Sequence, residues 1–229
     1  MKRSNKVLLI LSVILLSGVF VTDHLLAVNY SKIDLNDPYK NFSDVPVKPF
    51  NKIRIAGGNS YVVRVRQGKE FNIKLLNSRA SFFKMNQNSD TLNIRFNVSN
   101  RSPGQEFNPI TGIIITAPSI TYFEFAGTNT EIETFKQDTI LVKQGDNSIT
   151  RLKDLQTSFL KLSGEGFGIF DCQEGNNTNR FEVDLGNRTT MSMNGIIFRE
   201  FTPSLRDSAT IVLGTAGLNL LKKGNVFTE

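Results

Sequence analysis

Short apolar strands that end at a glycine recur five times in the second half of the chain. Within each copy apolar and polar residues alternate, which is the pattern of a half-buried β-strand. The copies follow one another about every 20 residues, a period typical of a chain that coils and stacks on itself. A glycine permits the sharp corner that each coil needs. The copies span 122–127, 141–145, 159–164, 181–186 and 210–214, and their corner glycines are Gly127, Gly145, Gly164, Gly186 and Gly214.

The region before the repeats shows the same alternation over residues 53–55, 61–65 and 71–75, which predicts further strands. Three glycines between these strands predict turns, because glycine accepts positive φ: Gly57, Gly58 and Gly68. Loops are expected over 97–111 and 195–205, and a polar terminal cap over 218–229. No amphipathic helix pattern of normal length follows residue 30. The sequence therefore predicts an all-β solenoid.

The N-terminus has the pattern of an export signal. Lys2, Arg3 and Lys6 precede an apolar segment over residues 7–28. At about 22 residues this segment is long enough to cross the hydrocarbon core of a bilayer. It is either a retained transmembrane anchor or a cleaved signal peptide. We favour the anchor, because the best cleavage pattern, Leu25-Leu26-Ala27, contains a bulky leucine.

Composition shifts divide the chain into three parts. Residues 1–28 form the transmembrane anchor or signal segment. Residues 29–49 read as an extended linker, because Pro38, Pro46 and Pro49 lie among polar residues. Residues 50–229 form the β-domain. The linker would hold this domain away from the bilayer.

The composition argues against several functional classes. The chain has 229 residues and a net charge of +6, which is too mild and too dispersed to indicate a nucleic-acid partner. Its single cysteine, Cys172, permits neither an intrachain disulfide nor a cysteine metal cluster. The only histidine, His24, lies in the N-terminal segment, which argues against a Ser-His-Asp or Cys-His hydrolase. We predict no catalytic residue, no cofactor and no metal site.

Two sets of polar residues are further candidates for catalytic or ligand-binding sites. Acidic residues with nearby arginines could perform glycoside chemistry or hold calcium, although alternating charges on a strand face more often serve solubility. These residues are Glu165, Asp171, Glu182 and Asp184, with Arg180 and Arg188. Asparagines and threonines at the corners could form ladders between coils, the interpretation that we favour, or offer polar groups to a glycan. They include Thr128, Asn129, Thr130, Asn147, Asn176, Asn177, Thr178, Asn187, Thr189 and Thr190.

The segment Phe50 to Gly68 carries a resemblance to a known family. It reads Phe-x-x-Ile-x-Ile-x-Gly-Gly-Asn, then Val-x-Val-x-Gln-Gly, and glycine-punctuated coils follow it. Over roughly 50–218 the chain resembles the auto-transporter adhesin head domain called the GIN domain, a domain of unknown function frequent in Bacteroidetes. The resemblance implies a single-stranded right-handed parallel β-helix exported across the inner membrane, with no catalytic motif. The corners depart from the family's Ser-Gly-Ser-Gly style, as at Ala126-Gly127-Thr128.

Together these features predict a non-enzymatic, membrane-tethered binding or scaffold module in a bacterial envelope. Residues 7–28 would anchor it in the inner membrane, with the domain in the periplasm. The first alternative is a surface adhesin head, released by signal cleavage, that binds glycan or host protein. A further, less favoured alternative is a polysaccharide lyase or hydrolase. The expected ligand is a protein or a glycan, and an uncapped coil end could support a homo-oligomer.

Overall fold

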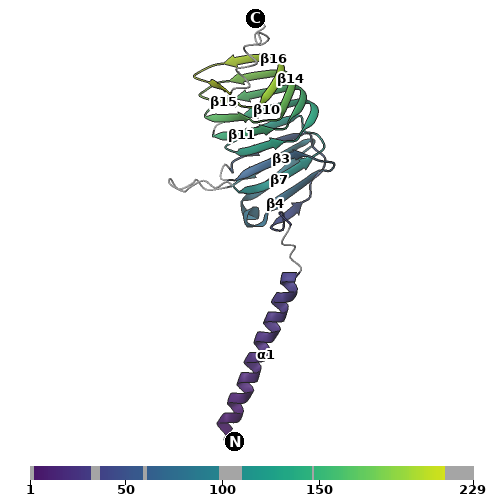
Figure 1. Ribbon diagram of the computed structural model, residues 1–229, viewed down its shortest axis with the longest axis vertical. Coiled ribbons are helices and arrows are strands. Elements are labelled where there is room, and N and C mark those ends of the chain that lie inside the picture. Colours follow the sequence, from purple (N-terminus) through teal and green to yellow (C-terminus); the bar gives the residue numbers. More distant parts are fainter. Residues whose placement is uncertain (1–2, 32–36, 59–60, 98–109, 146, 215–229) are drawn as a thin grey trace. The chain divides into compact units, whose positions relative to one another are not determined.

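The computed structural model describes residues 3–31, 37–58, 61–97, 110–145 and 147–214. These residues fall into two compact units, Met1–Phe42 and Ser43–Glu229. The first unit contains one long helix, α1 (Arg3–Ser31), and the second contains the sheets (Figure 1).

Helix α1 has no polar face. Its residues Asn5–Ser31 are long and apolar enough to cross a membrane, with a mean hydropathy of 2.1. The hydroxyls of Ser17 and Thr22 donate hydrogen bonds of 2.8 Å to the carbonyls of Val13 and Gly18, one turn earlier. Polar groups satisfied within the helix are compatible with a hydrocarbon environment. The helix fits either a signal sequence or a membrane anchor.

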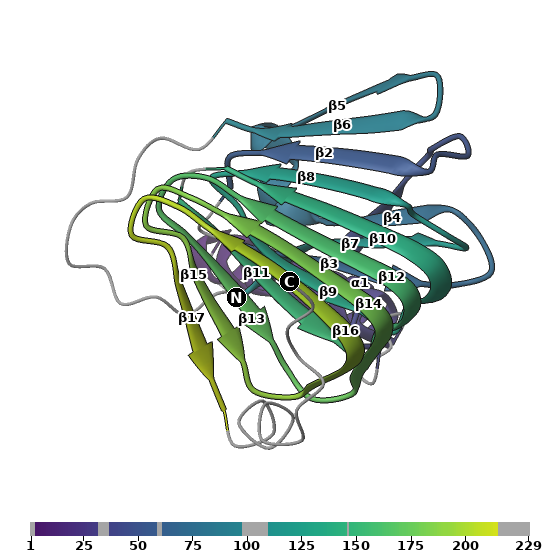
Figure 2. The same ribbon diagram turned by 90° about the horizontal axis from the view of Figure 1, so that it is seen from above.

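Two sheets make up the second unit (Figure 2). The nine-stranded sheet has the order β1 (Phe42–Val45), β4 (Asn72–Leu76), β7 (Thr111–Ala117), β3 (Val62–Gln67), β9 (Asn129–Glu133), β11 (Ser148–Lys153), β13 (Gly168–Cys172), β15 (Thr190–Met193) and β17 (Thr210–Leu213). The eight-stranded sheet has the order β16 (Ile196–Leu205), β14 (Asn176–Leu185), β12 (Gln156–Gly164), β10 (Lys136–Gln144), β8 (Tyr122–Ala126), β2 (Lys52–Ala56), β6 (Thr91–Phe96) and β5 (Phe83–Asn88). A 3₁₀ helix, Asn77–Phe82, connects β4 to β5.

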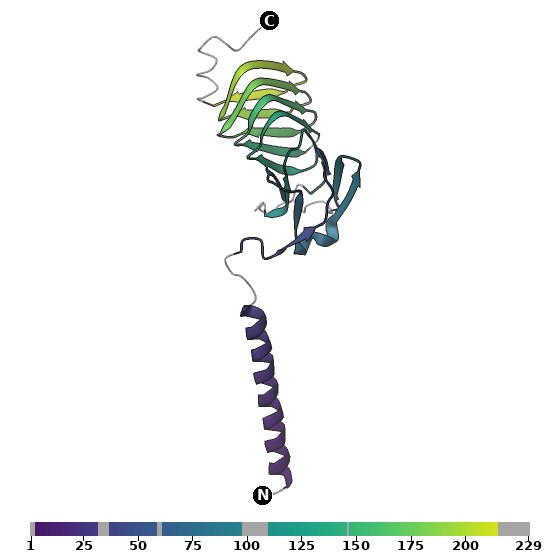
Figure 3. The same cartoon turned by 90° about the vertical axis from the view of Figure 1, so that its right-hand side faces the viewer.

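From β8 onward, successive strands alternate between the two sheets. Each strand pairs in parallel with the strand two places further along the chain, and Figure 3 shows the resulting layers. The register is regular: β10 pairs with β12 from Lys136↔Gln156 to Gln144↔Gly164. The repeat seen in the sequence is therefore one strand in each sheet plus two turns.

The prediction of a single-stranded right-handed parallel β-helix is wrong. The strands form two mixed sheets rather than a closed parallel solenoid. β4 pairs antiparallel with β7, and β5 pairs antiparallel with β6. The short turn at Ser89-Asp90, where Ser89 has φ 54°, lets the chain reverse directly into the neighbouring strand. A glycine period reports the length of a repeat, and it carries no information on how the first strands pair.

The core lies between the two sheets. Inward side chains of both sheets form one cluster, in which Phe123, Phe125, Phe135, Phe170 and Phe181 are among the largest fully buried groups. Phenylalanine has no polar atom to satisfy, which suits a layer enclosed between sheets.

Cys172 belongs to this core and is fully buried. Burial, followed by the nearby carboxylate of Asp171, raises the pKa of its thiol to about 12. The thiol therefore stays protonated at neutral pH, which makes it a small apolar core residue rather than a nucleophile.

Several predicted loop positions fall elsewhere in the structure. The predicted loop over 195–205 is wrong for 196–205, which form strand β16, whose Phe198 and Phe201 face the core. Part of the predicted linker, 29–49, forms strand β1. The predicted loop over 97–111 falls mostly, and the cap over 218–229 entirely, outside the described residues.

The glycines singled out in the sequence occupy different backbone environments. Gly57, Gly58 and Gly127 have φ of 78°, 78° and 63°, a region that favours glycine. Gly164 ends β12, and Gly145, Gly186 and Gly214 directly follow β10, β14 and β17. Gly68 directly follows β3 and lies against Thr116.

Gly164→Ala should destabilise the fold by about 1–3 kcal/mol, because overpacking a rigid core costs this much. A methyl group there would lie 2.8 Å from Thr189 Cγ2 and 2.9 Å from the buried ring of Phe170. Gly145→Ala is the matched control, since its added methyl group would meet nothing nearer than 3.5 Å. Chemical denaturation of both variants measures the difference, and equal stabilities would contradict the packing argument.

Candidate functional site

The four acidic candidates do not converge on one site. Asp171 lies on β13 of the nine-stranded sheet, whereas Glu182 and Asp184 lie on β14 of the eight-stranded sheet. Glu165 follows β12. The described residues contain no group of three or more His, Cys, Asp or Glu side chains placed to hold a metal ion.

Glu182 is held in its ionised form by two cations. Its carboxylate accepts hydrogen bonds from Lys161, at 3.2 Å, and from Arg180. Burial alone would raise the pKa of Glu182, but the hydrogen bonds and the positive charges of Lys161 and Arg180 together outweigh burial and bring the pKa below its ordinary value. A glycosidase acid needs the opposite shift, because it must carry a proton at working pH. The geometry assigns Glu182 to an ion-pair cluster on the sheet.

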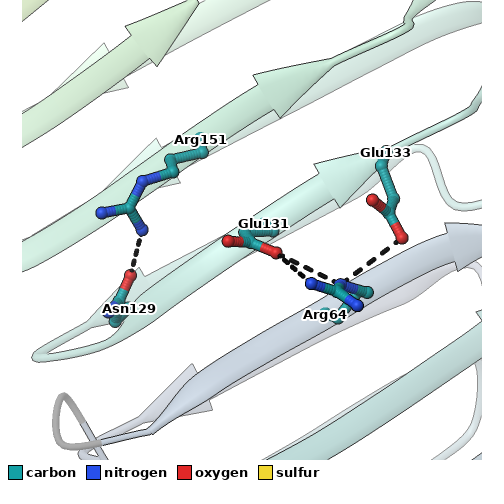
Figure 4. A network of polar contacts seen from close by, with 5 residues as sticks. All are labelled: Arg64, Asn129, Glu131, Glu133 and Arg151. Carbon is teal, nitrogen blue, oxygen red and sulfur yellow. Dashed lines mark hydrogen bonds and ion pairs between the residues drawn. The ribbon is translucent and has the colours of Figure 1, made fainter. Parts of the chain in front are cut away.

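The outer face of the nine-stranded sheet carries a ladder of paired charges (Figure 4). Arg64 Nη2 on β3 lies 2.9 Å from Glu131 Oε2 on β9, and Arg64 Nε lies 3.5 Å from Glu133 Oε1. Arg151 on β11 donates a 2.6 Å hydrogen bond to the side-chain oxygen of Asn129. These contacts link neighbouring parallel strands, and Arg64 offsets the charge of Glu131 and Glu133. The ladder therefore fits a structural role in fixing the register.

A polar groove opens at the turns that follow the carboxyl ends of β12, β14 and β16. Its volume is about 760 Å³. We call it the turn groove, and its lining is Gly145, Glu165, Gly166, Phe167, Asn187, Arg188, Asp207 and Ser208.

Two stacked turns of the same type form much of this groove. In Gly186–Thr189 and in Arg206–Ala209 the fourth residue donates its backbone N–H to the carbonyl of the first, at 3.1 and 3.0 Å. Both central residues of each turn have positive φ: 48° and 64° at Asn187 and Arg188, 50° and 64° at Asp207 and Ser208. These are type I′ turns, for which Asn-Gly or Asp-Gly is the preferred sequence.

Arg188 and Ser208 thus occupy the second central position of these turns, where glycine would adopt the left-handed conformation with the least strain. A left-handed conformation costs an ordinary residue about 1–2 kcal/mol. Such strain persists only where the surroundings fix the backbone, and here Arg188 N–H donates a 3.0 Å hydrogen bond to the carbonyl of Asp207 in the next turn. The buried hydroxyl of Thr189 also lies 2.9 Å from the carbonyl of Gly166. The stack holds the strained turns in place.

Phe167 supplies an aromatic surface in the turn groove. It is 58% exposed, unlike the phenylalanines of the core. The guanidinium carbon of Arg188 lies 4.8 Å from the centre of its ring, within cation–π range. Polar side chains line the rest of the groove. An exposed ring with hydrogen-bonding groups around it can bind a ligand that has both apolar faces and hydroxyls.

The turn groove brings together four residues named from the sequence, Gly145, Glu165, Asn187 and Arg188. Phe167, Asp207 and Ser208 were not predicted. An internal repeat could have found the last two, because 185–190 and 205–210 share the pattern Leu-x-(Asn/Asp)-x-x-Thr at a spacing of 20 residues. Phe167 gave no such signal, since its exposure depends on which way the turn faces.

The comparisons with known proteins identify the fold only. No family model and no curated protein matches the chain, so membership of the GIN domain family stays a prediction. Among solved structures, a "putative adhesin" from Bacteroides fragilis is 15% identical, with a TM-score of 0.50 over 76% of this chain and 93% of that one. A "putative lipid binding protein" from Parabacteroides distasonis is 11% identical, covering 76% and 94%, with a TM-score of 0.41.

A second "putative adhesin", from Parabacteroides merdae, is 9% identical, covers 75% of this chain and 95% of that one, and has a TM-score of 0.36. The first of the three similarities shows that this fold occurs in a Bacteroides fragilis protein described as a "putative adhesin". The other two are too distant to carry an argument.

Glu182→Gln should lower the free energy of unfolding by about 1 kcal/mol at neutral pH, because the charge in two hydrogen bonds is lost. The folded-state pKa lies below the ordinary value of 4.5, so this stabilisation is present above pH 4.5 and is lost as the pH falls through the folded-state pKa. Denaturation curves measured across this range should therefore converge at low pH. A difference that stays the same from neutral pH down to the lowest pH at which both proteins remain folded would contradict the ion-pair assignment.

Proposed function

We propose that the protein is a non-enzymatic binding module, exported and tethered in a bacterial envelope. The turn groove is the observation that carries this proposal, since it combines an exposed aromatic ring with polar side chains held on strained turns. Residues 7–28 would anchor the chain in the inner membrane, with the domain in the periplasm. The hydropathy of α1 supports this placement.

The ligand that suits the turn groove best is a glycan. A sugar ring offers C–H groups to an aromatic face and hydroxyls to carboxylate, amide and guanidinium groups. Phe167 provides the face, and Glu165, Asn187 and Asp207 provide acceptors. Charges of both signs line the groove. Such a lining suits a neutral ligand rich in hydroxyls better than a ligand that carries a strong charge of one sign.

The alternative is a surface adhesin head that reaches the cell exterior after signal cleavage. The fold shared with a protein described as a putative adhesin from Bacteroides fragilis supports this alternative. Both functions use the same groove, and they differ in where the domain is displayed.

Location distinguishes the two. For a tethered periplasmic module we expect a full-length mass from membrane extracts, and protection of the domain when intact cells are treated with protease. For the adhesin we expect a mass that lacks the N-terminal segment and cleavage of the domain at the cell surface. Protein found only in the cytoplasm would contradict both.

Arg188→Gly separates stability from binding. Glycine relieves the left-handed strain, so the substitution should stabilise the fold by about 0.5–1 kcal/mol. The substitution also removes the guanidinium that contacts the ring of Phe167. Binding to an array of neutral oligosaccharides should fall, and Phe167→Ala should weaken it about tenfold or more. The control is Thr134→Gly, an exposed position with φ 63° outside the groove, which should gain stability and keep full binding. Neutral-glycan binding that survives Phe167→Ala would overturn the assignment of the groove.

A further inference from the structure

A second groove of about 530 Å³ lies on the outer face of the eight-stranded sheet, over β5, β6, β2 and β8. Lys84 on β5 stands directly opposite Arg95 on β6 in the antiparallel register. Both side chains are exposed, and neither takes part in an ion pair among the described residues. We call this the cationic groove.

Like charges placed directly opposite on paired strands destabilise a sheet. The other strand pairs that the structure describes avoid the problem: on the nine-stranded sheet Arg64 faces Glu131 in the register, and one row from the cationic pair Arg54 meets Glu124 at 2.8 Å. Lys84 and Arg95 are therefore an exception to how the protein distributes charge. An anion between them would turn the repulsion into two charge-assisted contacts, and Arg95 could offer its planar fork to an oxyanion.

The cationic groove and the turn groove are joined along one corner of the sheet. Arg95 is in register with Ala56, and Ala56 with Ala126. Both alanines line the cationic groove. Gly145, which lines the turn groove, adjoins Ala126: its N–H donates a 2.7 Å hydrogen bond to the carbonyl of Phe125, and a methyl group on it would lie 3.7 Å from Ala126 Cβ.

The outward positions between the two grooves are therefore all small. Alanine and glycine leave a shallow path where longer side chains would block it. Between Arg95 on β6 and Phe167, which follows β12, this path runs along β6, β2, β8, β10 and β12, and neighbouring strands are about 4.8 Å apart. The path is thus roughly 19 Å long, enough for several sugar units of an extended chain.

Building on the proposed function, we propose that this corner binds a linear acidic polysaccharide. Its uronate or sulfate groups would lie between Lys84 and Arg95, its backbone would pass over Ala56, Ala126 and Gly145, and a sugar ring would stack on Phe167. Asn86 and Asn93, which face each other one row from the cations, supply amides for its hydroxyls.

The number and shape of the charges favour this ligand over other polyanions. A membrane surface attracts clusters of four to eight cations on a convex or flat face. Nucleic acid likewise needs a longer basic stripe. Here two unpaired cations lie in a concave groove at one end of a mostly neutral path, as a sparsely charged polymer requires.

The test is titration calorimetry on the full chain in a neutral detergent, with polygalacturonate, dextran sulfate and uncharged dextran as probes. The acidic polymers should bind more tightly than dextran. Lys84→Gln with Arg95→Gln should weaken acidic-polymer binding at least about tenfold and flatten its salt dependence by about one unit of slope per cation. Lys143→Gln with Arg199→Gln, exposed positions on the same sheet outside the groove, is the charge-matched control and should bind as the wild type does.

Phe167→Ala distinguishes this inference from the proposed function. It should weaken both acidic and neutral glycans, whereas the Lys84/Arg95 variant should leave neutral-glycan binding intact. Acidic polymers that bind no better than dextran, with Phe167-dependent binding retained, would overturn only the inference. Failure of every glycan would overturn both. If Phe167→Ala leaves the binding of acidic polymers unchanged, or if the protein prefers phosphatidylglycerol vesicles, the continuous polysaccharide site is overturned.

The free protein offers a second readout that needs no ligand. Removing the repulsion between Lys84 and Arg95 should raise the midpoint of thermal unfolding by a few degrees at low salt, relative to the Lys143/Arg199 control. The gain should shrink as salt screens the charges. An unchanged midpoint would contradict the repulsion on which the inference depends.

Discussion

The parallel backbone pairing between each strand and the strand two places later is the constraint on which the structure depends. An isolated coil of this chain would leave its strand N–H and C=O groups unpaired and half its apolar face exposed. Each coil is completed only by its neighbours. The pairing of β10 with β12 and of β12 with β14 keeps a fixed register, so equivalent positions of successive coils line up in rows. Every surface feature follows from these rows.

The same rows allow strained backbone conformations at the corners. Arg188 and Ser208 adopt left-handed backbone conformations in turns of a type that prefers glycine. A free turn of this sequence would relax, but each turn here is tied by backbone hydrogen bonds to the coils beside it. The stack can therefore display an arginine and a serine at positions where the local cost is unfavourable. A scaffold of this kind holds a binding surface rigid without a dedicated core beneath each residue.

The rows also separate charges that support the fold from charges available to a ligand. On the nine-stranded sheet, Arg64 satisfies Glu131 and Glu133 and links two strands. Glu182 does the same between Lys161 and Arg180 on the other sheet. Lys84 and Arg95 occupy equivalent cross-strand positions without an opposing acid among the described residues. The contrast between them, rather than the net charge of the chain, marks the corner as a site for an anion.

The sequence by itself determined the local features of this protein. Alternation predicted the strands, the N-terminal hydropathy predicted the apolar helix, and a lone Cys172 without a nearby histidine argued against thiol chemistry. The tertiary structure decided the rest. The antiparallel pairing of β4 with β7 and of β5 with β6 made two mixed sheets where the glycine period had indicated a closed β-helix. The tertiary structure also placed Asp171 and Glu182 on different sheets and left Phe167 exposed. The physical reason is that alternation records which face of a strand is buried, whereas pairing partners and turn direction depend on contacts between residues far apart in the chain.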